Sequence, residues 1–366
     1  MYGSRVQALL EGLGTPPRRY AVRVNTIRGE VDEVVEYFNG IGAKCKAHEA
    51  IEEAALISVE GPFEVDGLGN SITAKKHAAE SVMLGSNLYL PGVMRMQRAK
   101  VGDRVRIEDP RGHPVGFGVS KIHSGIRGNE GIAVQTLQSI YRLPPIRETP
   151  VFIDGKIQEQ SLPAILTSRI LDPQPGETIV DMCAAPGGKT AHIAQLQGDT
   201  GRILAFEHSP RRIGRMRAEL DRLGIRSVTL ERADSRYLDK DRPSLKADRV
   251  LVDPPCTALG VRPKLYEETG VAEVLSSAAF QKQFLRSAAR IAKPGGVVVY
   301  STCTITLEEN EDVVRFACEE LGLELEEPPL RVEGAGSGMG LKECVRFDPG
   351  LCEAPGFFIA RLRRSR

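Results

Sequence analysis

Short apolar runs alternate with longer segments of helical spacing over the C-terminal part of the chain, from about residue 146 to the end. The runs at 178–181, 249–252 and 296–300 are rich in Val and other apolar residues, which is typical of strands buried in a parallel sheet. Strands that alternate with helices in this way build a doubly wound α/β sheet. We therefore predict an α/β domain over residues 146–366.

The first part of the chain has a different pattern and predicts a small α+β region over residues 1–70. Apolar positions with helical spacing run over 31–38, and Asn39-Gly40 follows them as a helix stop. A β-rich run at 21–26 precedes this helix, and another at 56–60 follows it.

The segment between these two parts is dominated by short β runs separated by Gly and Pro. After a short helix expected over 74–84, the β runs lie at 104–108, 115–119 and 132–137. Several short strands with turn residues between them predict a small β-barrel over residues 71–145, which Pro144-Pro145 closes.

The composition of the 366 residues is that of a globular protein, with 41% hydrophobic and 27% charged residues. No run approaches the ~20 apolar residues of a membrane span, and the N-terminus lacks the apolar core of a signal peptide. Seven cysteines without a CxxC pair argue against a zinc ribbon or a disulfide framework and favour a reducing compartment. We therefore expect a cytoplasmic protein with no membrane or metal partner, and no oligomeric partner is implied.

The net charge of +1 hides a basic segment in the middle of the chain. Residues 71–150 carry 12 Lys and Arg against 6 Asp and Glu. A compact basic region in an otherwise neutral chain is a candidate surface for RNA or DNA. A solvated basic face without a partner remains the alternative at this point.

A turn of small residues follows the strand predicted at 178–181, in the order Cys183-Ala184-Ala185-Pro186-Gly187-Gly188-Lys189-Thr190. Such a turn between a strand and a helix lets main-chain N–H groups approach a ligand closely. Cys183 stands where a phosphate-binding P-loop needs Gly, and a dinucleotide GxGxxG is absent. The pattern favours a nucleoside cofactor without a polyphosphate, and a tight turn without a ligand is the alternative.

Two acidic residues end the next two predicted strands. Glu207 ends the run 202–207, about 20 residues after the turn, where a carboxylate accepts both hydroxyls of a ribose. Asp234 ends the run 228–234 and is placed to receive an adenine amino group. The alternative for each acid alone is a plain helix N-cap. Two of them at successive strand ends favour a nucleoside site.

Two thiols and a carboxylate follow two further strands, in Asp253-Pro254-Pro255-Cys256 and Ser301-Thr302-Cys303-Thr304. Reactive groups in an open α/β sheet gather at the carboxyl ends of the strands. We therefore expect these groups to share one crevice, which suits covalent chemistry on a pyrimidine ring. The alternative is that both thiols are simply buried.

These motifs resemble the Sun-domain RNA cytosine-5 methyltransferases, which use S-adenosylmethionine as cofactor. The resemblance spans residues 20–66 and 146–366 and includes Arg23-Val24-Asn25-Thr26 near the start and Gly356-Phe357-Phe358-Ile359-Ala360 near the end. It implies a Rossmann-like methyltransferase domain with a small RRM-like N-terminal piece. The segment between resembles a PUA domain, on the residues Gly85-Ser86-Asn87-Leu88-Tyr89-Leu90-Pro91-Gly92-Val93 and Gly102-Asp103. This arrangement resembles the subfamily that methylates the tRNA acceptor stem near the 3′ CCA end.

The resemblance also implies roles for individual residues. Cys303 attacks carbon 6 of cytosine, Asp253 holds the ring, and Cys256 assists proton loss from carbon 5 and release of the enzyme. Lys189 supplies positive potential beside the thiolate. One departure is Glu207, where many relatives carry Asp. The implied cofactor contacts are Cys183, Ala184, Ala185, Pro186, Gly187, Gly188, Lys189, Glu207, Arg212, Asp234 and Asp253.

Two other methyltransferase classes fit the thiols less well. An enzyme that methylates amino groups would carry an aromatic residue where Cys256 stands, to stack on its target. A DNA cytosine methyltransferase would use the cysteine of the Pro255-Cys256 dipeptide as nucleophile and would not need Cys303.

We expect RNA, above all tRNA, as the partner of this chain. Candidate contacts are Tyr89 for stacking on a base and Arg111 and Lys121 for phosphates. Arg23 and Asn25 are further candidates. A structural role is at least equally plausible for each of these five residues, and for Arg23 and Asn25 it would lie at the seam between the N-terminal piece and the catalytic sheet.

Overall fold

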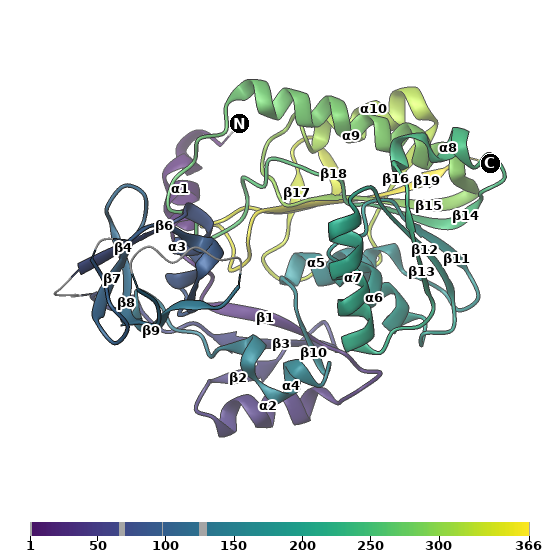
Figure 1. Ribbon diagram of the computed structural model, residues 1–366. Helices are drawn as coiled ribbons and strands as arrows, with labels where there is room; N and C mark the ends of the chain where they lie inside the picture. Colours follow the sequence, from purple (N-terminus) through teal and green to yellow (C-terminus); the bar gives the residue numbers. More distant parts are fainter. Residues whose placement is uncertain (1, 66–69, 97, 124–129, 366) are drawn as a thin grey trace.

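The computed structural model describes residues 2–65, 70–96, 98–123 and 130–365 and shows three sheets in three units (Figure 1). The N-terminal unit is drawn in purple below, the β-rich insertion in blue at the left, and the large α/β unit at the upper right (Figure 1). In the part of the chain that the structure describes, we find no helix with the length and apolar character needed to cross a bilayer.

The large unit contains a nine-stranded sheet with helices on both faces (Figure 1). Its elements are α5 (Leu162–Leu171), β11 (Thr178–Asp181), α6 (Gly188–Leu196), β12 (Arg202–Glu207), α7 (Pro210–Leu223), β13 (Val228–Arg232), η4 (Ser235–Tyr237), α8 (Leu238–Asp241), β14 (Ala247–Val252), α9 (Val271–Ile291), β15 (Ala292–Thr302), α10 (Glu311–Leu321), β16 (Leu323–Glu326), β17 (Gly336–Gly338), β18 (Leu341–Phe347) and β19 (Phe357–Arg364).

The strand order in this sheet is β13-β12-β11-β14-β15-β19-β18-β17, with β16 paired to β19. The first five strands of this order are parallel, and β19 joins them antiparallel. One core packs α5, α6 and α7 against one face, and a second packs α8, α9 and α10 against the other. The doubly wound α/β fold predicted from the sequence is confirmed. The order reverses between β11 and β14, which is where such sheets bind their ligands.

The insertion forms a six-stranded sheet in the order β5-β9-β8-β7-β4-β6. Its elements are β4 (Asn70–Ala74), α3 (Lys76–Val82), β5 (Leu88–Tyr89), η2 (Leu90–Gly92), β6 (Val93–Met96), β7 (Arg104–Glu108), β8 (Pro114–Ser120) and β9 (Ile132–Ser139). The helix expected over 74–84 is shorter, because residues 70–74 form a strand that pairs with β6 and β7. Both ends of the insertion meet at a bridge between Glu60 and Arg142, so it leaves and rejoins the chain at one neck.

The N-terminal unit takes one of its strands from beyond the insertion. Its sheet has the order β10-β1-β3-β2, and β10 lies past the boundary that we set at residue 146. Val34 and Phe38 of α2 pack on this sheet. The elements are β1 (Arg19–Val24), α2 (Val31–Gly40), β2 (Cys45–Ala47), β3 (Ala54–Ser58), η3 (Ile146–Glu148), α4 (Pro150–Ile153) and β10 (Ile157–Glu159). The preceding η1 (Gly3–Arg5) and α1 (Val6–Gly14) lie against the large unit instead, where Tyr2 Oη donates to Asp348 Oδ1 at 2.8 Å (Figure 1).

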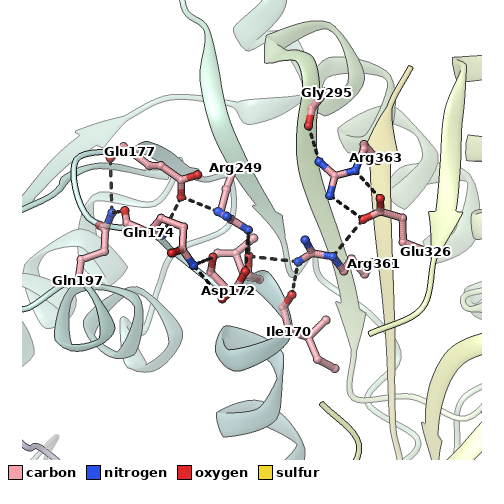
Figure 2. A network of polar contacts seen from close by, with 11 residues as sticks. Ile170, Asp172, Gln174, Glu177, Gln197, Arg249, Gly295, Glu326, Arg361 and Arg363 are labelled. Atoms are coloured by element: carbon pink, nitrogen blue, oxygen red, sulfur yellow. Dashed lines mark hydrogen bonds and ion pairs between the residues drawn. The ribbon is translucent and has the colours of Figure 1, made fainter. Parts of the chain in front are cut away.

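Buried arginines fasten the C-terminal end of α5 to the sheet (Figure 2). Arg361 of β19 donates to the main-chain oxygen of Ile170 at 2.6 Å and to Glu326 at 3.1 Å. Arg249 of β14 donates to the main-chain oxygen of Leu171 at 2.6 Å. The last carbonyls of a helix lack partners within the helix, and these guanidinium groups supply them.

We expect Arg361→Met to lower the free energy of unfolding by about 2–4 kcal/mol, because it leaves a buried carbonyl without its donor and breaks a half-buried ion pair. Urea denaturation followed by circular dichroism measures the loss. Arg18→Met is the matched control, since Arg18 is 89% exposed and Glu353 57% exposed in their ion pair and such pairs contribute at most about 1 kcal/mol. Equal losses in the two variants would contradict the role of Arg361.

Candidate active site

The two cysteines singled out in the sequence lie against each other beyond the ends of neighbouring parallel strands. β14 leads to Cys256 and β15 leads to Cys303, with Val252 of β14 paired to Tyr300 of β15. The two Sγ atoms are 3.4 Å apart, within hydrogen-bond distance for thiols. Cys303 also lines a cavity of about 660 Å³ between the N-terminal unit and the large unit. A ligand in this cavity would lie against Cys303.

The hydrogen bond between the thiols shifts their pKa values in opposite directions. The hydrogen bond from Cys256 lowers the pKa of Cys303, and the nearby Lys189 ammonium also lowers it, against the effect of burial. The same hydrogen bond, together with burial, raises the pKa of Cys256 well above its usual value. Within the pair, Cys303 is therefore the more acidic sulfur and Cys256 the favoured hydrogen-bond donor.

Asp253 lies at the end of β14 with both carboxylate oxygens engaged. One accepts from Lys189 Nζ at 2.7 Å, and the other accepts from Ser301 Oγ at 2.6 Å. Burial alone would lower the pKa of Lys189, but the ion pair with Asp253 outweighs burial and raises it. The ammonium also lies 5.3 Å from the centre of the Phe357 ring. Asp253 and Lys189 therefore form a fixed ion pair next to the thiols.

Hydrogen bonds to Asp181, the last residue of β11, hold the turn between β11 and α6 in place. This carboxylate accepts from Cys183 N at 3.2 Å and from Thr190 Oγ1 at 2.7 Å, and burial raises its pKa to about 6. Gly187 has a φ of +110°, and a Cβ there would lie 3.0 Å from Met216 Cγ. The backbone of the turn therefore requires glycine at this position. We did not assign Asp181 from the sequence, where its signal is an Asp at the strand end and a Thr early in the next helix.

The two acids predicted at successive strand ends are placed at the ends of β12 and β13. Glu207 is 3% exposed and accepts from Ser209 N at 2.9 Å, and Arg212 pairs with it at 3.1 Å. Asp234 pairs with Arg236 at 2.6 Å, which lowers the pKa of this carboxyl. Carboxylates have lone pairs to spare beyond these contacts. The pair therefore fits a ligand with a ribose diol and an adenine amino group.

The remaining residues predicted to hold the cofactor follow β11 and β12, whose carboxyl ends share one edge of the sheet. Ala184 and Ala185 are buried and Cys183 is half-buried, because the turn folds back over the end of β11. Arg212 of α7 donates to the main-chain oxygen of Ala185. This contact joins the turn to the residue that pairs with Glu207, so Arg212 bridges the turn and the first acid.

Arg23 and Asn25, two of our candidate RNA contacts, are buried in the protein. Each is 1% exposed. Arg23 Nε donates to Gln160 Oε1 at 2.9 Å, and Asn25 Nδ2 donates to the main-chain oxygen of Leu223 at 2.8 Å. Their assignment as RNA contacts is therefore wrong for this structure. They hold the seam between β1 and the large unit, which is the structural alternative.

The other three RNA candidates lie on the insertion, in different settings. Tyr89 is 47% exposed and lines a second cavity of about 650 Å³, and Lys121 is exposed. The Arg111 guanidinium lies 3.8 Å from the centre of the Tyr266 ring and 3.6 Å from a Glu268 oxygen. Arg111 therefore docks the insertion onto the segment that follows Cys256. In the same segment, the main-chain N–H of Leu265 donates to Glu80 of the insertion at 3.1 Å, which strengthens the contact between the two.

Two family models match this chain. The 16S rRNA methyltransferase RsmB/F model matches residues 168–363, and the PUA domain model matches residues 70–127.

Similar proteins and structures match along almost the whole chain. A tRNA (cytosine(72)-C(5))-methyltransferase of Pyrococcus horikoshii is 37% identical over 98% of this chain and 92% of its own length. The tRNA (cytosine(72)-C(5))-methyltransferase NSUN6 of Homo sapiens is 31% identical over 99% of this chain and 87% of its own. The crystal structure of NSun6 from Pyrococcus horikoshii with SFG matches with a TM-score of 0.90 at 37% identity, covering 98% of this chain and 94% of that one.

Proposed function

The chain belongs to the RsmB/F methyltransferase family, and we propose that it transfers a methyl group from S-adenosylmethionine to carbon 5 of a cytosine in tRNA. The observation that carries this proposal is the pair of thiols 3.4 Å apart beside the ion pair of Asp253 and Lys189. We place the target in the acceptor stem near the 3′ CCA end, in keeping with the names of the relatives and with the PUA domain.

S-adenosylmethionine is the cofactor, and the similar crystal structure contains SFG, an analogue of it. The buried carboxylate of Glu207 and the ionised Asp234 are the groups that we assign to its ribose and adenine. The main chain of the turn from Cys183 to Gly188 approaches its remaining parts. When bound, the cofactor supplies an electrophilic methyl group on a sulfonium.

The residues around the thiols perform the covalent part of the proposed reaction. Carbon 5 of cytosine is a weak nucleophile, and addition of the Cys303 thiolate to carbon 6 makes it enamine-like. Asp253 accepts a hydrogen bond from the exocyclic amine or from the protonated N3 of the ring, while Lys189 keeps the carboxylate in place. Once the Cys303 sulfur is bonded to carbon 6, Cys256 no longer donates to a thiolate and releases its own proton to solvent; the Cys256 thiolate then accepts the proton that carbon 5 loses.

RNA reaches this site across the insertion in our proposal. Tyr89 and Lys121 remain the candidate contacts, for a base and a phosphate respectively, and Arg111 instead keeps the insertion docked. The domain limits 1–70, 71–145 and 146–366 remain proposals, with β10 returning to the N-terminal sheet. The cytoplasmic location also remains a prediction from the cysteine content.

The proposed activity is tested with tRNA transcripts and methyl-labelled S-adenosylmethionine. We expect label in tRNA as 5-methylcytosine, and bisulfite sequencing should map it to the acceptor stem near the 3′ end. Ribosomal RNA fragments are the matched control, because the family model is named for 16S rRNA methyltransferases. Label confined to ribosomal RNA would contradict the tRNA proposal.

A further inference from the structure

A buried carboxylate, that of Glu309, lies between the two loops that carry the thiols. Glu309 is 0% exposed and sits in the turn before α10, a few residues after Cys303. Neither the sequence motifs nor the proposed mechanism gives it a role. Its contacts reach the loop of each thiol.

Each oxygen of Glu309 accepts two hydrogen bonds. Oε1 accepts from Thr257 N at 3.0 Å and from Gln281 Nε2 at 2.9 Å. Oε2 accepts from Thr257 Oγ1 at 2.5 Å and from Thr306 Oγ1 at 3.1 Å. Thr257 directly follows Cys256, so the carboxylate holds the loop of that thiol by both its main chain and its side chain.

A second line of contacts joins the same loops. Thr304, which directly follows Cys303, has its Oγ1 2.9 Å from Thr257 Oγ1. Because the Thr257 hydroxyl donates its hydrogen to Glu309, it accepts from Thr304. Gln281 of α9 also donates to the main-chain oxygen of Pro255 at 3.1 Å. The residues on both sides of Cys256 are thus tied to one buried group.

This carboxylate has no cationic partner within 4.0 Å in the described ranges of the chain. A buried charge is costly unless it is paired or fully hydrogen-bonded, and here four donors from the surrounding loops satisfy it. A carboxylate in this place therefore accepts more hydrogen bonds from the two loops than a neutral side chain would. We propose that Glu309 is a positioning residue that holds Cys256 against Cys303 for the release step.

The inference rests on the proposed function for its effect on catalysis. In release, Cys256 accepts the proton from carbon 5, and the electron pair of that C–H bond forms the double bond between carbons 5 and 6. The carbon 6–sulfur bond breaks, and its electron pair returns to Cys303 as a thiolate. Addition needs Cys303 alone, whereas release needs Cys256 within reach of carbon 5. Loss of Glu309 should therefore affect release more than addition.

We expect Glu309→Ala to lower turnover on tRNA by roughly 10–100-fold, because a displacement of about 1 Å costs that much. A protein–RNA adduct that survives denaturing gel electrophoresis should accumulate, while the first round of methyl transfer stays within about tenfold of the wild type. Glu309→Gln should restore turnover to within about threefold, since its amide oxygen can face the two N–H donors and its NH₂ can face the two hydroxyls. Thr257→Val is a second variant, with a smaller effect in the same direction.

Glu308→Ala is the matched control, because this neighbouring carboxylate makes no hydrogen bond within the described part of the chain. The proposal is overturned if Glu309→Ala behaves like the control, if it loses addition and release equally without an adduct, or if Glu309→Gln is as impaired as Glu309→Ala.

A measurement without RNA separates this inference from the proposed function. Diamide, a thiol oxidant, should take two hydrogens from the neighbouring thiols of the wild type and form a Cys256–Cys303 disulfide, identified by peptide mass mapping. We expect the disulfide to form roughly tenfold more slowly in Glu309→Ala and at the wild-type rate in Glu308→Ala. Equal rates in all three proteins would overturn the positioning role, even if the wild type methylates tRNA. Failure of the wild type to methylate RNA would instead count against the proposed function alone.

Discussion

We expect Cys303→Ala to reduce methyl transfer by a factor on the order of 10⁴ or more, to the background of the assay, because without a nucleophile carbon 5 of cytosine is not activated. The hydrogen bond from Cys256 and the charge of Lys189 both lower the pKa of Cys303, which favours this sulfur as the thiolate of the wild-type pair. Transfer of labelled methyl to tRNA measures the effect. A variant that retains more than about one per cent of the activity would contradict the assignment of Cys303 as nucleophile.

Another cysteine provides the control for this variant. Cys318 lies half-buried on α10, outside the thiol pair, and burial raises its pKa. Cys318→Ala should therefore keep methyl transfer within about twofold of the wild type. Loss of activity in both variants would point to a general effect of removing a buried thiol.

The second large effect is expected for Cys256→Ala, which should trap the enzyme on its RNA. Without the base that accepts the proton of carbon 5, the methylated adduct cannot eliminate Cys303, and turnover should fall by about 10²–10⁴-fold. The adduct should appear as a denaturant-stable band that contains both protein and RNA.

The double variant Cys256→Ala/Cys303→Ala identifies the sulfur in that band. It should form no adduct, because the trapped bond is to Cys303. An adduct in Cys303→Ala and none in Cys256→Ala would mean that the two thiols have the opposite roles.

The sequence predicted most of the large sheet because its signals are local. Runs such as 250–252 are apolar throughout, and strand ends followed by Cys256 and Cys303 must meet once neighbouring strands are parallel. The same reasoning placed Glu207 and Asp234 at adjacent strand ends. Strands 336–338 and 341–347 were missed, since glycines and charged residues interrupt their pattern.

Contacts between distant segments could not be predicted in this way. Arg23 resembles a surface contact in the sequence, yet it is buried because Gln160 and Gln195 lie opposite it in the folded chain. Glu309 gave no signal, since its partners Thr257 and Gln281 come from other elements. Such partners depend on how helices and loops pack against one another, and the hydrophobic pattern of a single segment does not predict that packing.

The insertion is attached at two places, and this has a consequence for RNA binding. The neck at Glu60 and Arg142 joins it to the chain, and Tyr266 holds it a second time through Arg111. A module on one neck alone would rotate, and its orientation would have to be fixed each time RNA bound, at a cost in entropy. With two attachments the module is pre-organised, so more of the free energy of its contacts with RNA remains available for affinity.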